Sequence, residues 1–130
     1  MTVARSEPGF EEHSEAYVLF SRGRWFLDRG HPGQAVLLLE RALALEPGRN
    51  SIREALGRAY FSLGQTRRAA EQFASIVAEV PDNDYAQYAL GRCLLKLGRT
   101  GEGRGRLRLA AALSPGTTTY RDALLDVVGS

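Results

Sequence analysis

The sequence predicts an all-α protein of three consecutive helix hairpins followed by one terminal helix. Pro47, Pro81 and Pro115 lie 34 residues apart, and two sets of glycines repeat at the same interval. Between these markers, apolar residues recur every three or four positions, which places them on one face of a helix. The repeated glycines are Gly30, Gly64 and Gly98 in one set, and Gly23, Gly57 and Gly91 in the other.

The middle hairpin, residues 50–83, shows how each helix is expected to begin and end. Gly64 can adopt the left-handed backbone conformation that ends the first helix without Cβ strain. Thr66 stands where an N-cap residue would open the second helix. Pro81 stops that helix, because proline has no N–H and disfavours helix at the residue before it. The apolar faces of the two helices are Leu56, Tyr60 and Leu63, and then Ala69, Phe73, Ile76 and Val77.

With Gly57 between Leu56 and Tyr60, this hairpin resembles the helix–turn–helix unit of the tetratricopeptide repeat family, a 34-residue module. The resemblance extends over three frames, residues 16–49, 50–83 and 84–117, which cover 102 of the 130 residues. It implies a right-handed α-α superhelix whose first helices line a concave groove. It also implies a non-enzymatic protein–protein interaction scaffold or adaptor that binds a peptide or partner segment in that groove.

The first repeat is expected to open with a helix from about residue 14 to residue 28 or 29. Pro32 is expected at the start of the second helix, where its missing N–H costs nothing. Arg22 stands where the other frames have leucine, a departure that an exposed end repeat tolerates. The aromatic residues of this first helix are Tyr17, Phe20, Trp25 and Phe26.

The third repeat begins regularly, with Asp84 as the expected cap of its first helix. Its second helix is interrupted by Gly101, Gly103 and Gly105. Each interior glycine costs up to about 1 kcal/mol of helix stability relative to alanine. We therefore expect this helix to start late or to fray.

The two ends of the chain differ in character. Residues 118–130 predict an amphipathic helix that caps the open end of the stack. Residues 1–13 are expected to form a flexible tail, which leaves 14–130 as a single repeat domain. The charge of −3 over residues 1–15 fits a solvated leader. A second interpretation is that the tail folds back onto the basic inner surface as an internal competitor. The apolar face of the terminal helix is Tyr120, Leu124 and Val127 or Val128.

Composition is that of an ordinary globular protein, with 44% hydrophobic and 25% charged residues. The net charge of +2 is too small to indicate a polyanionic partner. The basic residues are sixteen arginines and one lysine, which indicates either a coding bias or a use for forked recognition of carboxylates and phosphates. The sequence has no apolar run that would span a membrane and no secretory signal pattern, so a cytoplasmic protein is expected.

The sequence offers no pattern for catalysis, for a cofactor or for a metal. His13 and His31 lie in the tail and in a turn, away from carboxylates or thiols at metal-ligand spacing. The glycine-rich stretch at 101–105 follows no strand, so it is not expected to cradle phosphate. Cys93 is the only cysteine, which excludes an intrachain disulfide, and it is expected to fill a small gap in the core.

The resemblance implies that the second, fifth, ninth and twelfth positions of each first helix point into the groove, and we call these the inner positions. The ninth position is arginine in every frame, which predicts a ladder of Arg24, Arg58 and Arg92. Such a ladder would clasp an acidic peptide or a C-terminal carboxylate whose side chains rest on aromatic rings. Alternatively, the arginines are solvated, each stacked on a neighbouring ring or paired with Glu54. The predicted partner-binding residues are Tyr17, Phe20, Arg24, Leu27, Glu54, Arg58, Phe61, Tyr85, Tyr88, Arg92 and Leu95, and Ser51 is the remaining inner position.

Some members of the family bind chaperone tails through a two-carboxylate clamp of lysine, asparagine and arginine. In this sequence the clamp positions hold other residues, so the resemblance does not extend to that binding mode. The residues at those positions are Phe20, Arg24, Ala55, Tyr85 and Ala89.

Two other functions stay open at this point. The third repeat has six basic and two acidic residues, so Arg99, Arg104 and Arg108 would face phosphates if nucleic acid were the ligand. Tyr85 or Tyr88 would then stack on bases. Self-association is the other possibility, through Trp25, Phe26 or the terminal helix.

Overall fold

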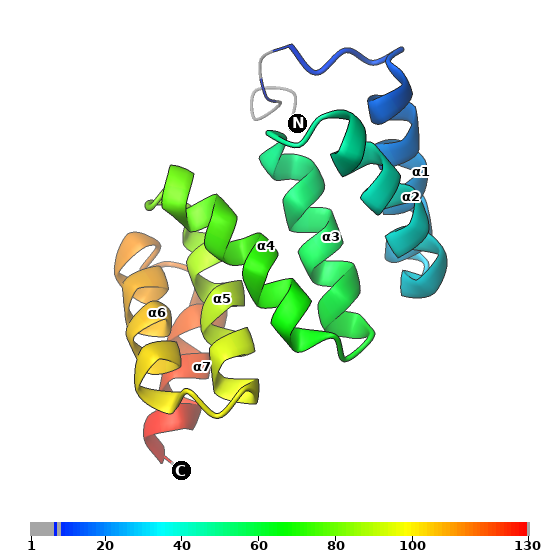
Figure 1. Cartoon of the computed structure of the whole chain (residues 1–130). Coiled ribbons are helices and arrows are strands. Elements are labelled where there is room, and N and C mark those ends of the chain that lie inside the picture. The colour runs from blue at the N-terminus through cyan, green and yellow to red at the C-terminus, as the bar shows by residue number, and fades with distance from the viewer. Residues whose placement is uncertain (1–6, 8, 130) are drawn as a thin grey trace. The chain divides into compact units, whose positions relative to one another are not determined.

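The computed structural model describes residues 7 and 9–129, and the chain divides into two compact units. Unit 1 spans residues 1–65, and its described residues form three helices that pack in chain order. Its helices α1 and α2 are antiparallel neighbours, and α3 packs beside α2 (Figure 1). Their bounds are Glu15–Asp28 for α1, Pro32–Leu45 for α2 and Asn50–Ser62 for α3.

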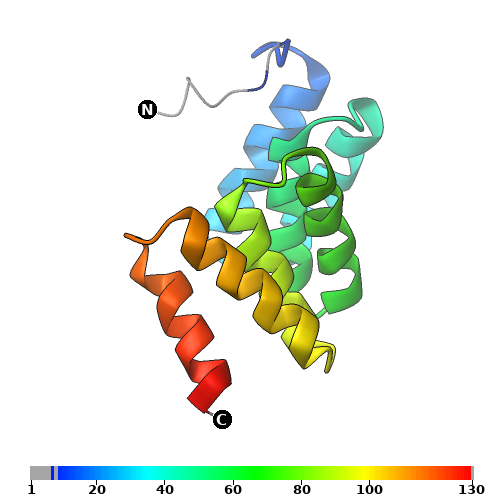
Figure 2. The same ribbon diagram turned by 90° about the vertical axis from the view of Figure 1, so that its left-hand side faces the viewer.

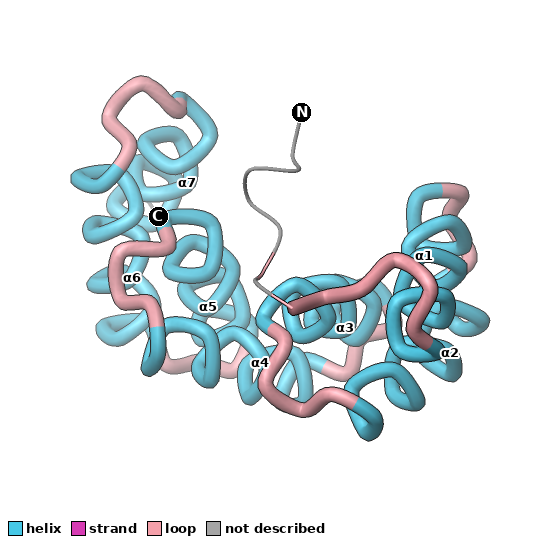
Figure 3. The backbone as a smooth tube through the Cα atoms, turned by 90° about the horizontal axis from the view of Figure 1, so that it is seen from above, coloured by secondary structure: helices cyan, strands magenta, loops and turns pink. Residues whose placement is uncertain are grey.

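Unit 2 spans residues 66–130 and contains four helices. Each packs on the next one in the chain, and α6 and α7 run antiparallel (Figure 2). Over the described residues the backbone consists of helices and loops, with no strand (Figure 3), so the predicted all-α class is confirmed. The bounds are Thr66–Glu79 for α4, Asp84–Lys96 for α5, Thr100–Leu113 for α6 and Thr118–Gly129 for α7.

The turn inside each hairpin has the predicted geometry. Gly30, Gly64 and Gly98 adopt φ values of +80°, +78° and +82°, which only glycine adopts at little cost. Pro32 occupies the first turn of α2, as predicted. Two details of the predicted helix starts were wrong.

Those two details concern the first residues of α4 and α5. Thr66 is the first residue of α4 rather than its cap. Asn83, not Asp84, caps α5, because the Asn83 side-chain oxygen accepts a hydrogen bond from the Ala86 N–H at 3.0 Å. Asp84 follows in the first turn, where its charge favours the helix N-terminus.

Small residues on the first helix let the second helix of a hairpin approach closely. A Cβ atom built on Gly23 would lie 2.7 Å from Cγ of Leu39, closer than side chains pack. In unit 2, Gly91 and Gly103 face each other in the same way, since a Cβ on Gly103 would lie 2.9 Å from the Gly91 carbonyl oxygen. The repeated apolar positions of the second helices are all buried: Leu39, Phe73 and Leu107, and Ala42, Ile76 and Ala110.

The expectation that the glycine-rich helix starts late or frays was wrong, since α6 is helical from Thr100 onward. Two contacts offset its low intrinsic propensity. The Arg99 guanidinium donates to both carboxylate oxygens of Glu102, at 2.7 and 2.8 Å, across the first turn. Gly103 packs directly on α5, so its missing side chain is what the tertiary contact requires.

Cys93 is fully buried in α5, as its predicted core role requires. Burial raises the pKa of its thiol to about 11, so the thiol stays protonated at neutral pH.

The three glycines of α6 should respond to alanine in opposite directions. Gly103→Ala should destabilise the protein by about 1–3 kcal/mol, because the new methyl group overlaps Gly91 and Leu95. Gly101→Ala and Gly105→Ala, where a Cβ meets no atom within 4 Å, should each stabilise it by about 0.5–1 kcal/mol. Urea unfolding followed by circular dichroism measures both effects. Equal responses at the three positions would contradict the packing described for Gly103.

Candidate functional site

The inner positions of unit 1 gather on α1 and α3. The Arg24 guanidinium lies over the Phe20 ring, 5.6 Å from its centroid. The Tyr17 ring meets Phe20 edge-on at 6.2 Å. On α3, the Arg58 guanidinium lies 3.8 Å from a carboxylate oxygen of Asp28. Phe20 is buried and Arg24 exposed, whereas the remaining predicted residues of unit 1 are half-buried: Tyr17, Leu27, Ser51, Glu54, Arg58 and Phe61.

Glu54 lies among these arginines. Burial raises the pKa of its carboxyl group above the usual 4.5, and the positive charges of Arg58 and Arg24 oppose that rise. Arg24 and Arg58 thus act electrostatically on a carboxyl group that the chain itself supplies.

The inner positions of unit 2 lie on α5. The Arg92 guanidinium lies 5.7 Å from the centroid of the Tyr88 ring. Tyr88 in turn stacks at a tilt on Tyr120 of α7, with centroids 4.9 Å apart. Tyr85 lies 6.0 Å from Tyr88, so these rings form a continuous aromatic surface along α5 and α7. Leu95 packs toward α6, where it contacts Gly103, and is half-buried.

Tyr120 fixes α7 to the start of α5. Its hydroxyl group donates to a carboxylate oxygen of Asp84 at 2.8 Å. Burial, together with this hydrogen bond to a carboxylate, raises the pKa of the Tyr120 hydroxyl group. This bond holds one end of the aromatic surface of unit 2 in place.

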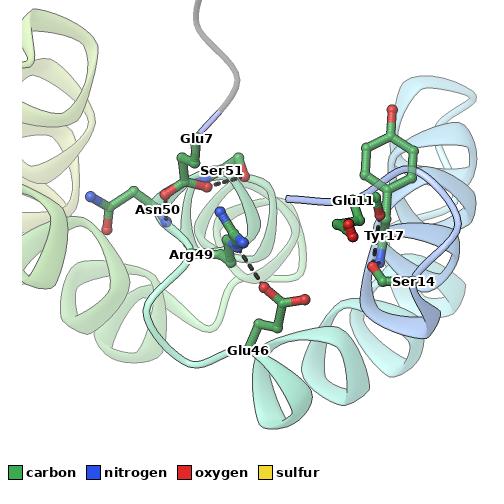
Figure 4. A network of polar contacts seen from close by, with 8 residues as sticks. All are labelled: Glu7, Glu11, Ser14, Tyr17, Glu46, Arg49, Asn50 and Ser51. Carbon is green, nitrogen blue, oxygen red and sulfur yellow. Dashed lines mark hydrogen bonds and ion pairs between the residues drawn. The ribbon is translucent and has the colours of Figure 1, made fainter. Parts of the chain in front are cut away.

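A polar network whose residues lie outside the predicted partner-binding set is found at the N-terminus of α3 (Figure 4). The carboxylate of Glu7 accepts hydrogen bonds from the N–H groups of Asn50 and Ser51, at 2.6 and 3.2 Å. It also accepts one from the Ser51 hydroxyl at 2.6 Å. Beside it, Arg49 donates to Glu46 at 2.6 Å and places its guanidinium 4.6 Å from the centroid of the Phe10 ring.

Phe10 packs against the first inner positions of unit 1. Its ring centroid lies 5.1 Å from that of Tyr17 and 5.4 Å from that of Phe20. Two residues of the predicted partner-binding set are thus in contact with the N-terminal segment, by which we mean residues 7 and 9–14. The sequence signal for this contact is Arg49, because an arginine at an N-cap position leaves the first N–H groups of α3 to another acceptor.

The arginines considered for nucleic-acid binding lie at the start of α6 and along it, whereas Trp25 and Phe26, considered for self-association, lie on α1. Arg99 is paired with Glu102, and Arg104 is half-buried on α6. Arg108 is exposed on α6. On α1, the half-exposed Trp25 and its neighbours Ser21, Arg22 and Phe26 line a shallow hollow of about 480 Å³.

The part of the chain that the structure describes has neither a metal-binding cluster nor a membrane-spanning helix. Within it, histidine, cysteine and carboxylate side chains form no group of three that would hold a metal ion. None of its helices has the length and apolar character that crossing a bilayer requires.

Two family models, both described as tetratricopeptide repeat, match the chain over residues 54–116 and residues 26–79. Together they span most of the three predicted frames. The chain belongs to the tetratricopeptide repeat family. No curated protein sequence matches it.

Solved tetratricopeptide repeat structures are similar to the chain at low sequence identity. The first such domain of Spaghetti (RPAP3), bound to the HSP90 peptide SRMEEVD, has a TM-score of 0.83 at 18% identity, over 88% of this chain and 91% of that one. MamA has a TM-score of 0.81 at 19% sequence identity, over 86% of this chain and 66% of that one. The C-terminal domain of a putative FK506-binding protein of Plasmodium falciparum has a TM-score of 0.81 at 18% sequence identity. The match covers 88% of this chain and 87% of that one. These likenesses confirm the predicted fold.

The burial of Glu54 predicts a pH-dependent difference in stability. A carboxyl group whose pKa is raised on folding favours the folded state when protonated, and this contribution is lost as the pH rises through the folded-state pKa. Glu54→Gln, which stays neutral, should therefore be more stable than the wild type at pH 7, and the difference should shrink towards pH 4.5. Urea midpoints measured across this range test it.

Glu71→Gln, at an exposed position of α4, provides the control for the removal of a carboxyl group. A Glu54→Gln variant that is less stable than the wild type at pH 7 would mean that attraction to the two arginines outweighs the cost of burial.

Proposed function

We propose that this chain is a non-enzymatic protein-interaction scaffold that binds an extended acidic peptide through its inner-position arginines and rings. One observation carries the proposal. The fifth and ninth positions of the first and third repeats make the same contact, Arg24 over Phe20 at 5.6 Å and Arg92 over Tyr88 at 5.7 Å. An arrangement that recurs in two units at equivalent positions supports a shared role at the surface.

The chemistry of this pair suits a peptide carboxylate. A guanidinium that lies over an aromatic ring has one face covered, while its N–H groups point outward in the plane of the guanidinium group. Those groups match the two oxygens of a carboxylate and bind it more strongly than neutral donors would. The exposed parts of the neighbouring rings offer apolar contact to the next side chain of the peptide. Both arginine side chains are exposed.

The second repeat differs at the fifth position, where Glu54 replaces the ring. Its charge lies close to Arg24 and Arg58 and competes with an incoming carboxylate for them. The proposed surface of unit 1 therefore selects against a peptide with several adjacent carboxylates and favours spaced acidic residues. In unit 2 Tyr120 is buried, so Tyr85 and Tyr88 are the rings that a ligand can reach, and they favour a ligand with apolar side chains.

The comparisons support peptide binding as a class but not the identity of the peptide. The similar domain of RPAP3 is described as bound to an HSP90 peptide that ends in acidic and apolar residues. The clamp positions of this chain hold Ala55 and Ala89, which have no polar side chain to bind a terminal carboxylate. We therefore assign recognition of acidic residues to the arginine ladder instead.

A triple substitution tests the proposal. Peptides of twelve residues are first selected on the wild-type protein from a random displayed library. Arg24→Ala/Arg58→Ala/Arg92→Ala should then weaken the best of them by at least about tenfold, because each lost charge-assisted hydrogen bond contributes about 1.5–3 kcal/mol. Fluorescence anisotropy with the labelled peptides measures the affinities.

The control removes the same charge elsewhere, from exposed arginines of α4, α6 and α7. This second triple variant, Arg67→Ala/Arg108→Ala/Arg121→Ala, should bind as the wild type does. If the two triple variants bind the selected peptides equally well, the ladder is not the binding site.

A further inference from the structure

The N-terminal segment contacts unit 1 as a bound peptide would. The carboxylate of Glu7 meets three donors at the start of α3, with two distances of 2.6 Å and one of 3.2 Å. Gly9, with φ of +79°, turns the chain between this carboxylate and Phe10. Phe10 then packs on two inner positions, Tyr17 and Phe20. One acidic and one aromatic side chain, three positions apart, provide these contacts, and Figure 4 shows those of the acidic residue, Glu7.

The start of α3 differs from the starts of α1 and α5. α1 has its own cap, because the Ser14 hydroxyl accepts a hydrogen bond from the Tyr17 N–H at 3.1 Å. α5 likewise has Asn83. α3 has Arg49 at its N-cap position, and an arginine side chain has no oxygen with which to accept a hydrogen bond. Its N-terminal N–H groups therefore need an acceptor from elsewhere, and Glu7 supplies one.

Arg49 joins the two halves of this contact. Its guanidinium is held by Glu46 at 2.6 Å, and its side chain is only 14% exposed. One side of the guanidinium is covered by the Phe10 ring, and Gly9 lies against its end. The surface thus consists of a helix N-terminus whose N–H groups donate to a carboxylate, the guanidinium of Arg49, and the rings of Tyr17 and Phe20.

We propose that Glu7, Gly9 and Phe10 form an intramolecular ligand that occupies the unit 1 part of the peptide-binding surface, and that a partner peptide binds there by displacing it. This inference rests on the proposed function, since it assumes that Tyr17 and Phe20 bind a partner. It also defines the partner further. The displacing peptide carries an acidic residue three positions before an aromatic residue, because that spacing satisfies both the N-terminus of α3 and the two rings.

Tethering determines how strongly the segment competes. A ligand joined to its site by a short linker has an effective concentration in the millimolar range, so it excludes weak peptides and yields to tight ones. The contact is limited to a few side chains, which keeps it displaceable. The N-terminal segment therefore sets the affinity that a peptide must exceed in order to bind the unit 1 part of the surface.

The test uses the full chain and a labelled peptide with the sequence of residues 7–13, EPGFEEH. Glu7→Ala/Phe10→Ala removes both anchoring side chains and should bind this probe at least about tenfold more tightly than the wild type does. Glu12→Ala/His13→Ala alters two exposed residues of the same segment and also removes one carboxylate. This control variant should bind the probe as the wild type does. Circular dichroism confirms that each variant is folded.

If the double variant does not fold, Glu7→Gln retains Phe10 and the size of the side chain while it removes the charge. That single variant should then bind the probe more tightly than the wild type, by a smaller factor. Adding Arg49→Ala to either variant should abolish the gain, because the guanidinium contacts the probe phenylalanine as it contacts Phe10.

Two results would overturn the inference. If the probe binds the wild type and the opened variants equally, the segment does not cover the site. If the probe binds none of them, the segment only caps α3, and Glu7→Ala should then lower the melting temperature alone. The library-selected peptides separate this result from a failure of the proposed function, since their dependence on the arginine ladder is measured in the wild-type protein.

Discussion

The close approach of the two helices within a hairpin is the constraint on which the other features of each unit depend. At Gly23 in unit 1, and at Gly91 and Gly103 in unit 2, no side chain separates the helices, so the partner leucine or backbone lies directly against the glycine. Helices that touch in this way cannot rotate about their axes without a clash. The rotational setting of α1 and α5 is thereby fixed, and with it the direction in which Arg24 and Arg92 point.

The sequence predicts most of the fold because the relevant signals are local and repeated. The glycine turn at Gly64 and the proline after α4 each fix a helix boundary within a few residues, and the same signals return 34 residues later. The prediction for α6 was wrong because it counted intrinsic propensity alone. Gly103 weakens an isolated helix, but in the folded unit it allows the contact with α5 that stabilises the same helix.

The candidate site is predicted in part. Helical spacing placed Tyr17, Phe20 and Arg24 on one stripe, and the ring contacts agree with that grouping. The same spacing does not reveal that Glu54 is half-buried, since burial depends on how α1 and α3 pack. Nor does it reveal the contact of Glu7 with α3, because the pairing joins segments far apart in sequence and its only local sign is an arginine at a cap position.

That pairing also ties the first turn of α3 to the beginning of the chain. Glu7 and Asn50 are 43 residues apart, so this turn has its acceptor only when α1 and α2 bring the two segments together. Amide exchange at Asn50 and Ser51 then reports whether the whole of the first repeat is in place, rather than the local stability of the helix to which they belong.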